Sequence, residues 1–141
     1  MDHFRDLLAC PACGGGLDAS WSCVNCCTQY RTDDGIPNLR LPGNNRTETV
    51  RQFYEQAPFP GYPPNDSLAW LRARAERSSF ARMLDQAIPG DARIAEIGCG
   101  TGQMSLYVAR ADGVVIGADL RRASLLLGAA AARRFGIDRV Q

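Results

Sequence analysis

The sequence predicts an α/β protein built from a small β-rich module and the beginning of a parallel β-α-β-α unit. Three observations predict this arrangement. Five cysteines crowd the first 30 residues, an apolar run ends in three glycines at alternate positions, and strand-like and helix-like segments alternate after residue 91. We expect residues 1–41 to form the module, residues 42–66 to connect, and residues 67–141 to begin the α/β unit.

The composition is that of a soluble globular protein, since 45% of the 141 residues are hydrophobic and 22% are charged. No apolar stretch is long enough for a membrane span, and the N-terminus lacks the core of a signal peptide, so we expect a cytoplasmic protein without membrane association. The formal net charge of +1 does not indicate a nucleic-acid partner.

Two C-x-x-C pairs, Cys10 with Cys13 and Cys23 with Cys26, are separated by nine residues. Thiolates three positions apart can converge on one ion, and two such turns supply the four sulfurs that tetrahedral zinc prefers. These four cysteines are therefore the predicted ligands of a structural zinc. Cys27 could replace Cys26, but the C-x-x-C spacing favours Cys26.

The segment between the two pairs is too short for a helix and suits a small hairpin. A module of this size buries too little surface to fold alone. We therefore expect the metal to supply most of its stability, with a binding free energy on the order of 10 kcal/mol.

The run from Leu8 to Leu41 resembles the Trm112-like zinc ribbon family. The resemblance rests on Cys-Pro-Ala-Cys-Gly-Gly-Gly-Leu, the second cysteine pair, Tyr30, and Asp-Gly-Ile-Pro-Asn-Leu at 34–39. Family members occur alone as small partner proteins of methyltransferases or are fused ahead of a methyltransferase domain. The resemblance implies a β-rich ribbon, with Tyr30 leading out of the second zinc knuckle, that can contact a protein partner. Cys27 is an extra thiol that the family pattern does not require.

The connector begins at residues 41–46, which are rich in residues that end regular structure. A short helix is expected over residues 48–56. Prolines favour an extended path over residues 57–64. There Phe59 and Tyr62 could cover a ligand site or fasten the connector to the domain surface, and we favour fastening.

A long helix is predicted from Asp66 or Ser67 to Ile88, stopped by the Pro-Gly pair that follows. Its second half carries apolar residues at the spacing of one helical face, which we expect to pack on the sheet. These residues are Phe80, Met83, Leu84, Ala87 and Ile88.

The α/β unit follows, and its alternating order implies a parallel sheet with right-handed crossovers. Strands are predicted at Ala92–Ile97 and Val114–Ala118, helices at Gly102–Ala111 and Ser124–Phe135, and the start of a third strand at Asp138–Gln141.

The glycine-rich turn after the first strand indicates a nucleotide-like ligand, because ligands of parallel sheets lie beyond the carboxyl ends of the strands. Asp119 lies 21 residues after Gly98 and ends the second strand, where a carboxylate can accept the hydroxyl protons of a ribose. A dinucleotide fingerprint would place its third glycine at position 103, which is Gln103.

Glu96 and the three glycines match the E/D-x-G-x-G-x-G motif, and Ile94–Tyr107 resembles the class I S-adenosylmethionine-dependent methyltransferases. The resemblance implies a truncated Rossmann-like unit that binds S-adenosyl-L-methionine. By that resemblance the backbone at the glycines lies along the methionine and ribose portions of the cofactor. Glu96 orients the methionine end, and Asp119 binds the ribose hydroxyls. Cys99 is interpreted as a small filler. The cofactor-binding residues so implied are Glu96, Gly98, Cys99, Gly100, Thr101, Gly102, Asp119 and Leu120.

A class I methyltransferase domain needs about seven strands, and this sequence ends inside the third. The family's substrate-binding and catalytic groups come later, so no catalytic residue is assigned. We expect a fragment of a longer protein that binds the cofactor weakly and does not turn over alone. The methyl acceptor is not identified by the sequence, which is compatible with an RNA, a protein or a small molecule.

Two alternatives remain open. One is a zinc-ribbon adaptor whose partial α/β unit is not catalytic and only docks on another chain. The other is an NAD-dependent oxidoreductase, which Gln103 disfavours.

Overall fold

The computed structural model describes residues 2–41, 61–63 and 65–141. The chain separates into two compact units, Met1–Glu48 and Thr49–Gln141. The predictions of a helix over residues 48–56 and of a role for Phe59 lie outside the described residues. None of the helices among the described residues has the length and apolar character needed to cross a membrane.

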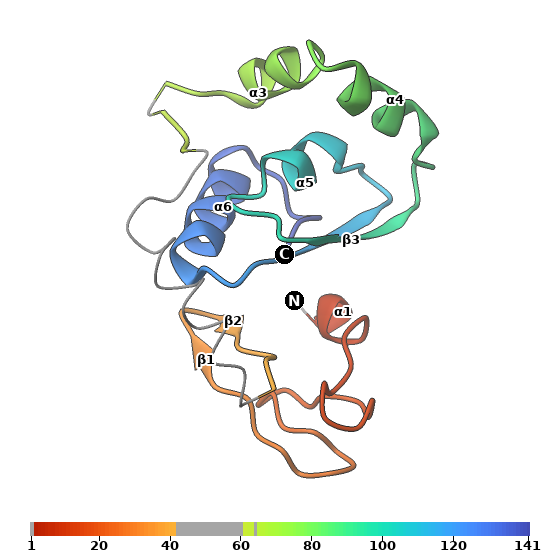
Figure 1. The fold of residues 1–141 in the computed structure, drawn as a ribbon, viewed down its shortest axis with the longest axis vertical. Coiled ribbons are helices and arrows are strands. Elements are labelled where there is room, and N and C mark those ends of the chain that lie inside the picture. The colour runs from red at the N-terminus through yellow and green to blue at the C-terminus, as the bar shows by residue number, and fades with distance from the viewer. Residues whose placement is uncertain (1, 42–60, 64) are drawn as a thin grey trace. The chain divides into compact units, whose positions relative to one another are not determined.

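The first unit contains a short helix and a small antiparallel hairpin (Figure 1). Helix α1 spans Asp2–Arg5, and strand β1, Thr32–Asp33, pairs with strand β2, Ile36–Pro37. Asp34 and Gly35 join the strands with φ angles of 48° and 79°. An Asp-Gly pair with both φ angles positive is the sequence that two-residue hairpin turns favour.

The segment between the two cysteine pairs folds back on itself as predicted. Isolated antiparallel bridges join Leu17 to Cys23 and Ser22 to Gln29. The small core of this unit consists of Cys10, Leu17, Cys23 and Tyr30, packed against Leu8, Trp21 and Leu39.

The second unit begins with two helices where the sequence predicts one, so that prediction is wrong. Helix α3 spans Leu68–Ala75 and helix α4 spans Ser79–Ala87 (Figure 1). Ser78 separates them with an extended backbone, and its hydroxyl accepts a hydrogen bond from the Ala81 amide at 3.3 Å. A serine N-cap of this kind starts a new helix by satisfying an amide of its first turn.

The face of α4 predicted to pack on the sheet is also partly wrong. Phe80 and Met83 are 58% and 60% exposed, and Ala87 is exposed as well. Only Leu84 and Ile88 of the predicted set pack against the core.

Two contacts explain why α4 turns a different face inward. Ala81 is 1% exposed, and its small side chain allows α4 to approach the core closely. Asp85 forms an ion pair with Arg110, which also donates to the Asp85 carbonyl at 3.3 Å. These contacts orient the side of α4 that carries Ala81 and Asp85 toward the rest of the unit.

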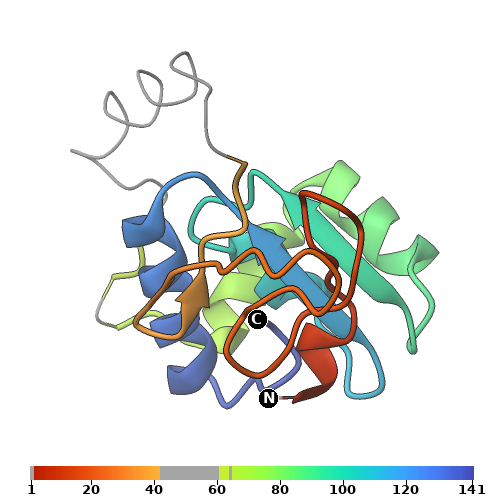
Figure 2. The same ribbon diagram turned by 90° about the horizontal axis from the view of Figure 1, so that it is seen from below.

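Strands and helices then alternate as predicted. Strand β3, Arg93–Ile97, pairs in parallel with strand β4, Val114–Ala118 (Figure 2). Helix α5, Gln103–Val108, connects them and ends three residues before the predicted Ala111. Helix α6, Arg122–Arg134, follows β4.

The last residues pair with the free edge of β4, as the predicted start of a third strand requires. Val140 forms a parallel bridge with Val115. The Val115 amide donates to Arg139 O at 2.8 Å, and the Gly117 amide donates to Gln141 O at 2.8 Å. Strand β4 is therefore hydrogen-bonded on both sides.

The helices pack on one face of this sheet, the face that carries Val115. The opposite face carries Ile97, which is 83% exposed, and Arg93 and Ala95, which are also exposed. The described residues of the second unit thus form two layers, with the core between the helices and β4. The core consists of Leu71, Ala81, Leu106, Tyr107, Val108, Val115, Ala131 and Ala132.

Gly128 allows α6 to pack against the glycine-rich turn. A Cβ at position 128 would lie 2.7 Å from the Thr101 carbonyl oxygen. We expect Gly128→Ala to lower the free energy of unfolding by about 1–3 kcal/mol through this clash, although alanine favours helices by about 1 kcal/mol over glycine. Urea denaturation measures the change. Gly90→Ala, where the added Cβ meets open space, is the control; a Gly128→Ala protein at least as stable as the wild type would contradict the expected packing.

Candidate functional site

Four cysteine sulfurs converge in the first unit. The Sγ atoms of Cys10, Cys13, Cys23 and Cys26 all lie within 4.8 Å of one another. The Cys13–Cys23 pair is 3.4 Å apart and the Cys10–Cys26 pair 3.7 Å. Zinc bonded tetrahedrally to sulfur at about 2.3 Å gives sulfur–sulfur distances of about 3.8 Å. The cluster can therefore hold a metal ion such as zinc.

Cys27 lies outside this cluster. Its φ angle is 58°, and its amide donates to the Cys23 carbonyl at 3.0 Å. The turn that this bond closes brings Cys26, not Cys27, to the other three sulfurs.

The four cysteines differ in exposure and in electrostatic surroundings. Cys10 and Cys23 are each 2% exposed, whereas Cys13 and Cys26 are exposed. Hydrogen bonds from the Thr28 hydroxyl and the Thr28 amide lower the pKa of the Cys26 thiol to about 6. Thiolates are the form that binds a metal, so Thr28 favours the ligand form of Cys26.

The glycine-rich turn between β3 and α5 has a left-handed backbone at each of its glycines. The φ angles of Gly98, Gly100 and Gly102 are 76°, 57° and 73°. Glycine adopts this conformation without the steric cost that a Cβ brings. A Cβ on Gly98 would meet no atom within 4 Å, so glycine is required there by conformation and the space beside it is open.

Three successive amides fasten this turn to the end of β4. The Gly98 and Cys99 amides donate to the Ala118 carbonyl at 2.7 and 3.0 Å. The Gly100 amide donates to Oδ2 of Asp119 at 2.8 Å. The predicted glycines and the predicted acid are therefore brought together directly.

Asp119 also stabilises the start of the next segment. Its Oδ1 accepts from the Arg121 amide at 2.8 Å, and the side chain is 11% exposed. Each oxygen therefore has a protein donor, but a carboxylate oxygen carries two lone pairs. Acceptor capacity for a ligand hydroxyl remains. Leu120, the other residue predicted beside this end of β4, is 41% exposed.

Glu96 has a protein partner that the sequence analysis missed. Its Oε2 accepts a hydrogen bond from the Ser105 hydroxyl on α5. Ser105 is 1% exposed. The sequence did carry a signal for this contact, because Ser105 stands among the apolar residues of a short helix. A hydroxyl buried in that position needs a hydrogen-bond partner.

Cys99 is surrounded as a packing residue. It is 9% exposed, and its Sγ occupies the space beside Gly117, where a Cβ would lie 2.9 Å from that sulfur. Burial, followed by the nearby carboxylates of Glu96 and Asp119, raises the pKa of the Cys99 thiol to about 12.

Tyr62 fastens the end of the connector to the glycine-rich turn. Its hydroxyl donates to the Thr101 carbonyl at 2.7 Å, and its ring meets Phe135 edge to face at 6.2 Å. Nearby, Gln103 Nε2 donates to the Gly61 carbonyl at 3.1 Å. These contacts hold the connector on the surface of the domain, which is the role that the sequence analysis favoured for Tyr62.

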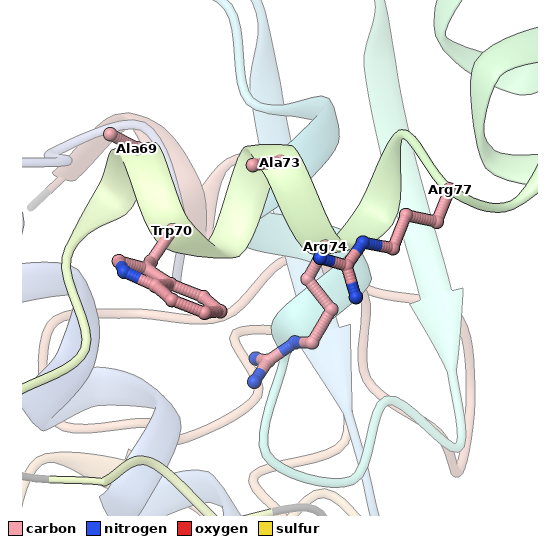
Figure 3. Close-up of a pocket in the computed structure, with 5 residues that line it drawn as sticks. All are labelled: Ala69, Trp70, Ala73, Arg74 and Arg77. Carbon is pink, nitrogen blue, oxygen red and sulfur yellow. The ribbon is translucent and has the colours of Figure 1, made fainter.

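Two shallow hollows lie beside α3. One, of about 270 Å³, is lined by Ala69, Trp70, Ala73, Arg74 and Arg77 (Figure 3). The other, of about 280 Å³, has Gln103 and Tyr107 among the residues that line it. Neither of these two hollows is lined by Glu96, Asp119 or the three glycines.

Comparison with known proteins gives no match, either to a protein-family model or to a curated protein. The assignment of both candidate sites therefore rests on the residues and geometry described above.

The raised pKa of Cys99 predicts an unreactive thiol. At pH 8 a thiol with a pKa of about 12 is ionised in about one molecule in ten thousand, and the thiolate is the nucleophile. We expect iodoacetamide to modify the exposed Cys27 in the folded protein and to leave Cys99 intact, as read by peptide mass spectrometry. Unfolding in urea should make Cys99 reactive, which is the control. Equal rates at the two cysteines of the folded protein would contradict the packing role.

Proposed function

We propose that the chain is a structural zinc ribbon joined to the start of a class I S-adenosylmethionine-dependent methyltransferase domain. The observation that carries the methyltransferase half is the glycine-rich turn itself. Its three glycines have left-handed φ angles, and its Gly100 amide is bonded to the acid that ends the neighbouring parallel strand.

This turn suits S-adenosyl-L-methionine because it offers bare backbone and acids instead of a phosphate site. Open space beside Gly98 permits close approach of a ligand. Glu96 and Asp119 supply carboxylates for a cationic ligand and for its ribose hydroxyls. When bound, the cofactor supplies an electrophilic methyl group on sulfur for transfer to a nucleophilic acceptor. The chain's own part in this step is to bind and orient the cofactor.

Gln103 stands where a dinucleotide fingerprint needs its third glycine, and its side chain is used in the fold. Its amide group donates to Gly61 O and accepts from Arg74 Nη2 at 3.2 Å. The glycine that a dinucleotide fingerprint needs at this position would remove both contacts.

In the first unit, the four-cysteine cluster supports a structural zinc. Four thiolates fill a tetrahedral site and leave no open position for substrate. The core of this unit includes two of the ligands themselves, Cys10 and Cys23, so the ion would replace the apolar interior that the unit is too small to build.

A protein-binding adaptor is the second candidate, and the uncovered sheet face favours it. Ile97 is 83% exposed on a face that also carries Arg93 and Ala95. A partner that covered this face would remove the Ile97 side chain from water, which is favourable. In this alternative the partner covers β3, and the glycine-rich turn is structural.

Zinc content tests the first half of the proposal. We expect one zinc per chain in protein purified without oxygen, and loss of most of it in Cys13→Ser and Cys26→Ser, because each removes one of four ligands. Cys27→Ser is the matched control and should keep its zinc, since this sulfur lies outside the cluster. Elemental analysis gives the ratio. Much less than one zinc in the wild type, or loss in Cys27→Ser alone, would reject the assignment.

Backbone NMR with S-adenosylhomocysteine tests the second half. We expect millimolar ligand to shift the amide signals of Gly98, Gly100 and Gly102, with an affinity weaker than micromolar. Asp119→Ala should abolish the shifts, whereas Asp138→Ala, which removes a carboxylate that is 91% exposed, should not. NAD should cause smaller shifts. Unchanged signals throughout the turn at millimolar S-adenosylhomocysteine would overturn the cofactor proposal.

A further inference from the structure

Two hydroxyl groups contact two of the clustered sulfurs. The Tyr30 oxygen lies 3.0 Å from Cys10 Sγ, and the Thr28 oxygen lies 3.1 Å from Cys26 Sγ. The two sulfurs belong to different C-x-x-C pairs, and both hydroxyls come from the short segment that follows the second pair. One segment therefore reaches both halves of the cluster.

We propose that Tyr30 and Thr28 are positioning residues of the metal centre, each donating a hydrogen bond from its hydroxyl group to a ligating thiolate. This inference rests on the metal proposed above. A cysteine bound to a metal is deprotonated and has no proton to donate. The hydroxyl must then be the donor in each pair, and the sulfur the acceptor.

The surroundings of Tyr30 favour this role over simple packing. Tyr30 is 6% exposed and belongs to the small core with Leu17 and Cys10. Its amide donates to the Trp21 carbonyl at 3.0 Å, which fixes the backbone from which the ring extends. A phenylalanine would fill the same core without bringing a polar oxygen into it. The hydroxyl is placed where the thiolate of the buried Cys10 can accept a hydrogen bond from it.

Thr28 is held in place by the same turn that holds the second cysteine pair. Its carbonyl accepts from the Cys23 amide at 2.9 Å. Cys26, whose sulfur it contacts, is an exposed residue, so water competes for this thiolate. We therefore expect the Thr28 contact to contribute less to metal binding than the Tyr30 contact.

These two donors act together with backbone donors. The amides of Asn25 and Cys26 approach Cys23 Sγ at 3.4 and 3.5 Å. Four thiolates and one divalent ion carry a net charge of −2, and hydrogen bonds to the sulfurs spread that charge. Partners of this kind orient metal ligands, and their removal typically lowers metal affinity 10–100-fold.

The zinc dissociation constant of the full chain tests the proposal, by competition with a chromophoric chelator. Tyr30→Phe should weaken zinc binding tenfold or more, and Thr28→Val should weaken it by a smaller factor. Thr32→Val in β1 removes an exposed threonine, and Tyr107→Phe removes a buried tyrosine hydroxyl from the other unit. Both controls should bind zinc as the wild type does.

Substitution of cobalt(II) for zinc separates hydrogen bonding from packing. Loss of a donor leaves the thiolate richer in electrons, so the sulfur-to-cobalt charge-transfer band of Tyr30→Phe should move to lower energy. Loss of packing alone would leave the band of a four-sulfur site in place. An unshifted band with unchanged zinc affinity in Tyr30→Phe would overturn the role of the tyrosine. A wild type that holds no zinc would instead overturn the proposed metal site. That result is distinct from a zinc-bound wild type in which Tyr30→Phe has no effect.

Should Tyr30→Phe fail to fold, Thr28→Val decides the outcome, because Thr28 lies on the exposed side of the cluster. A shifted cobalt band with weaker zinc binding in Thr28→Val supports the proposal. Zinc affinity and a band equal to those of Thr32→Val contradict it.

Discussion

The second unit depends on the contact between the glycine-rich turn and the end of β4. The amides of Gly98 and Cys99 share the Ala118 carbonyl, and the next amide, that of Gly100, goes to Asp119. The turn is held from another side by α6, which Gly128 lets approach the Thr101 carbonyl. Gly98, Gly100 and Asp119 therefore stabilise the fold even without a ligand. That dual use explains why one short motif fixes both where α5 begins and where a ligand would lie.

Most of the α/β order was predictable because its signals are local. Strands β3 and β4 match their predicted bounds to within one residue, since each is a short apolar run ended by a turn. The single helix predicted before them was wrong because Ser78 begins a second helix, a competition between capping and helix propensity that spacing does not reveal. The inward face of α4 depends on the pairing of Asp85 with Arg110, a contact between residues far apart in sequence.

The candidate sites divide in the same way. Convergence of four cysteines could be predicted because each C-x-x-C pair is a local turn, and the choice of Cys26 over Cys27 follows from the backbone reversal at Cys27, where φ is 58°. The partners of the two acids could not be predicted. Glu96 bonds Ser105 on the following helix, and Asp119 bonds the amide of Gly100 in the preceding turn, so these bonds appear only when the chain is folded.

The alternation of buried and exposed cysteines has a kinetic consequence for the first unit. Each C-x-x-C pair contributes one buried residue, Cys10 or Cys23, and one exposed residue, Cys13 or Cys26. A competing chelator would reach the exposed cysteines first and displace them one at a time, while the buried pair still held the ion. The lifetime of a bound metal would then be set by the exposed half of the site, and the integrity of the small core by the buried half.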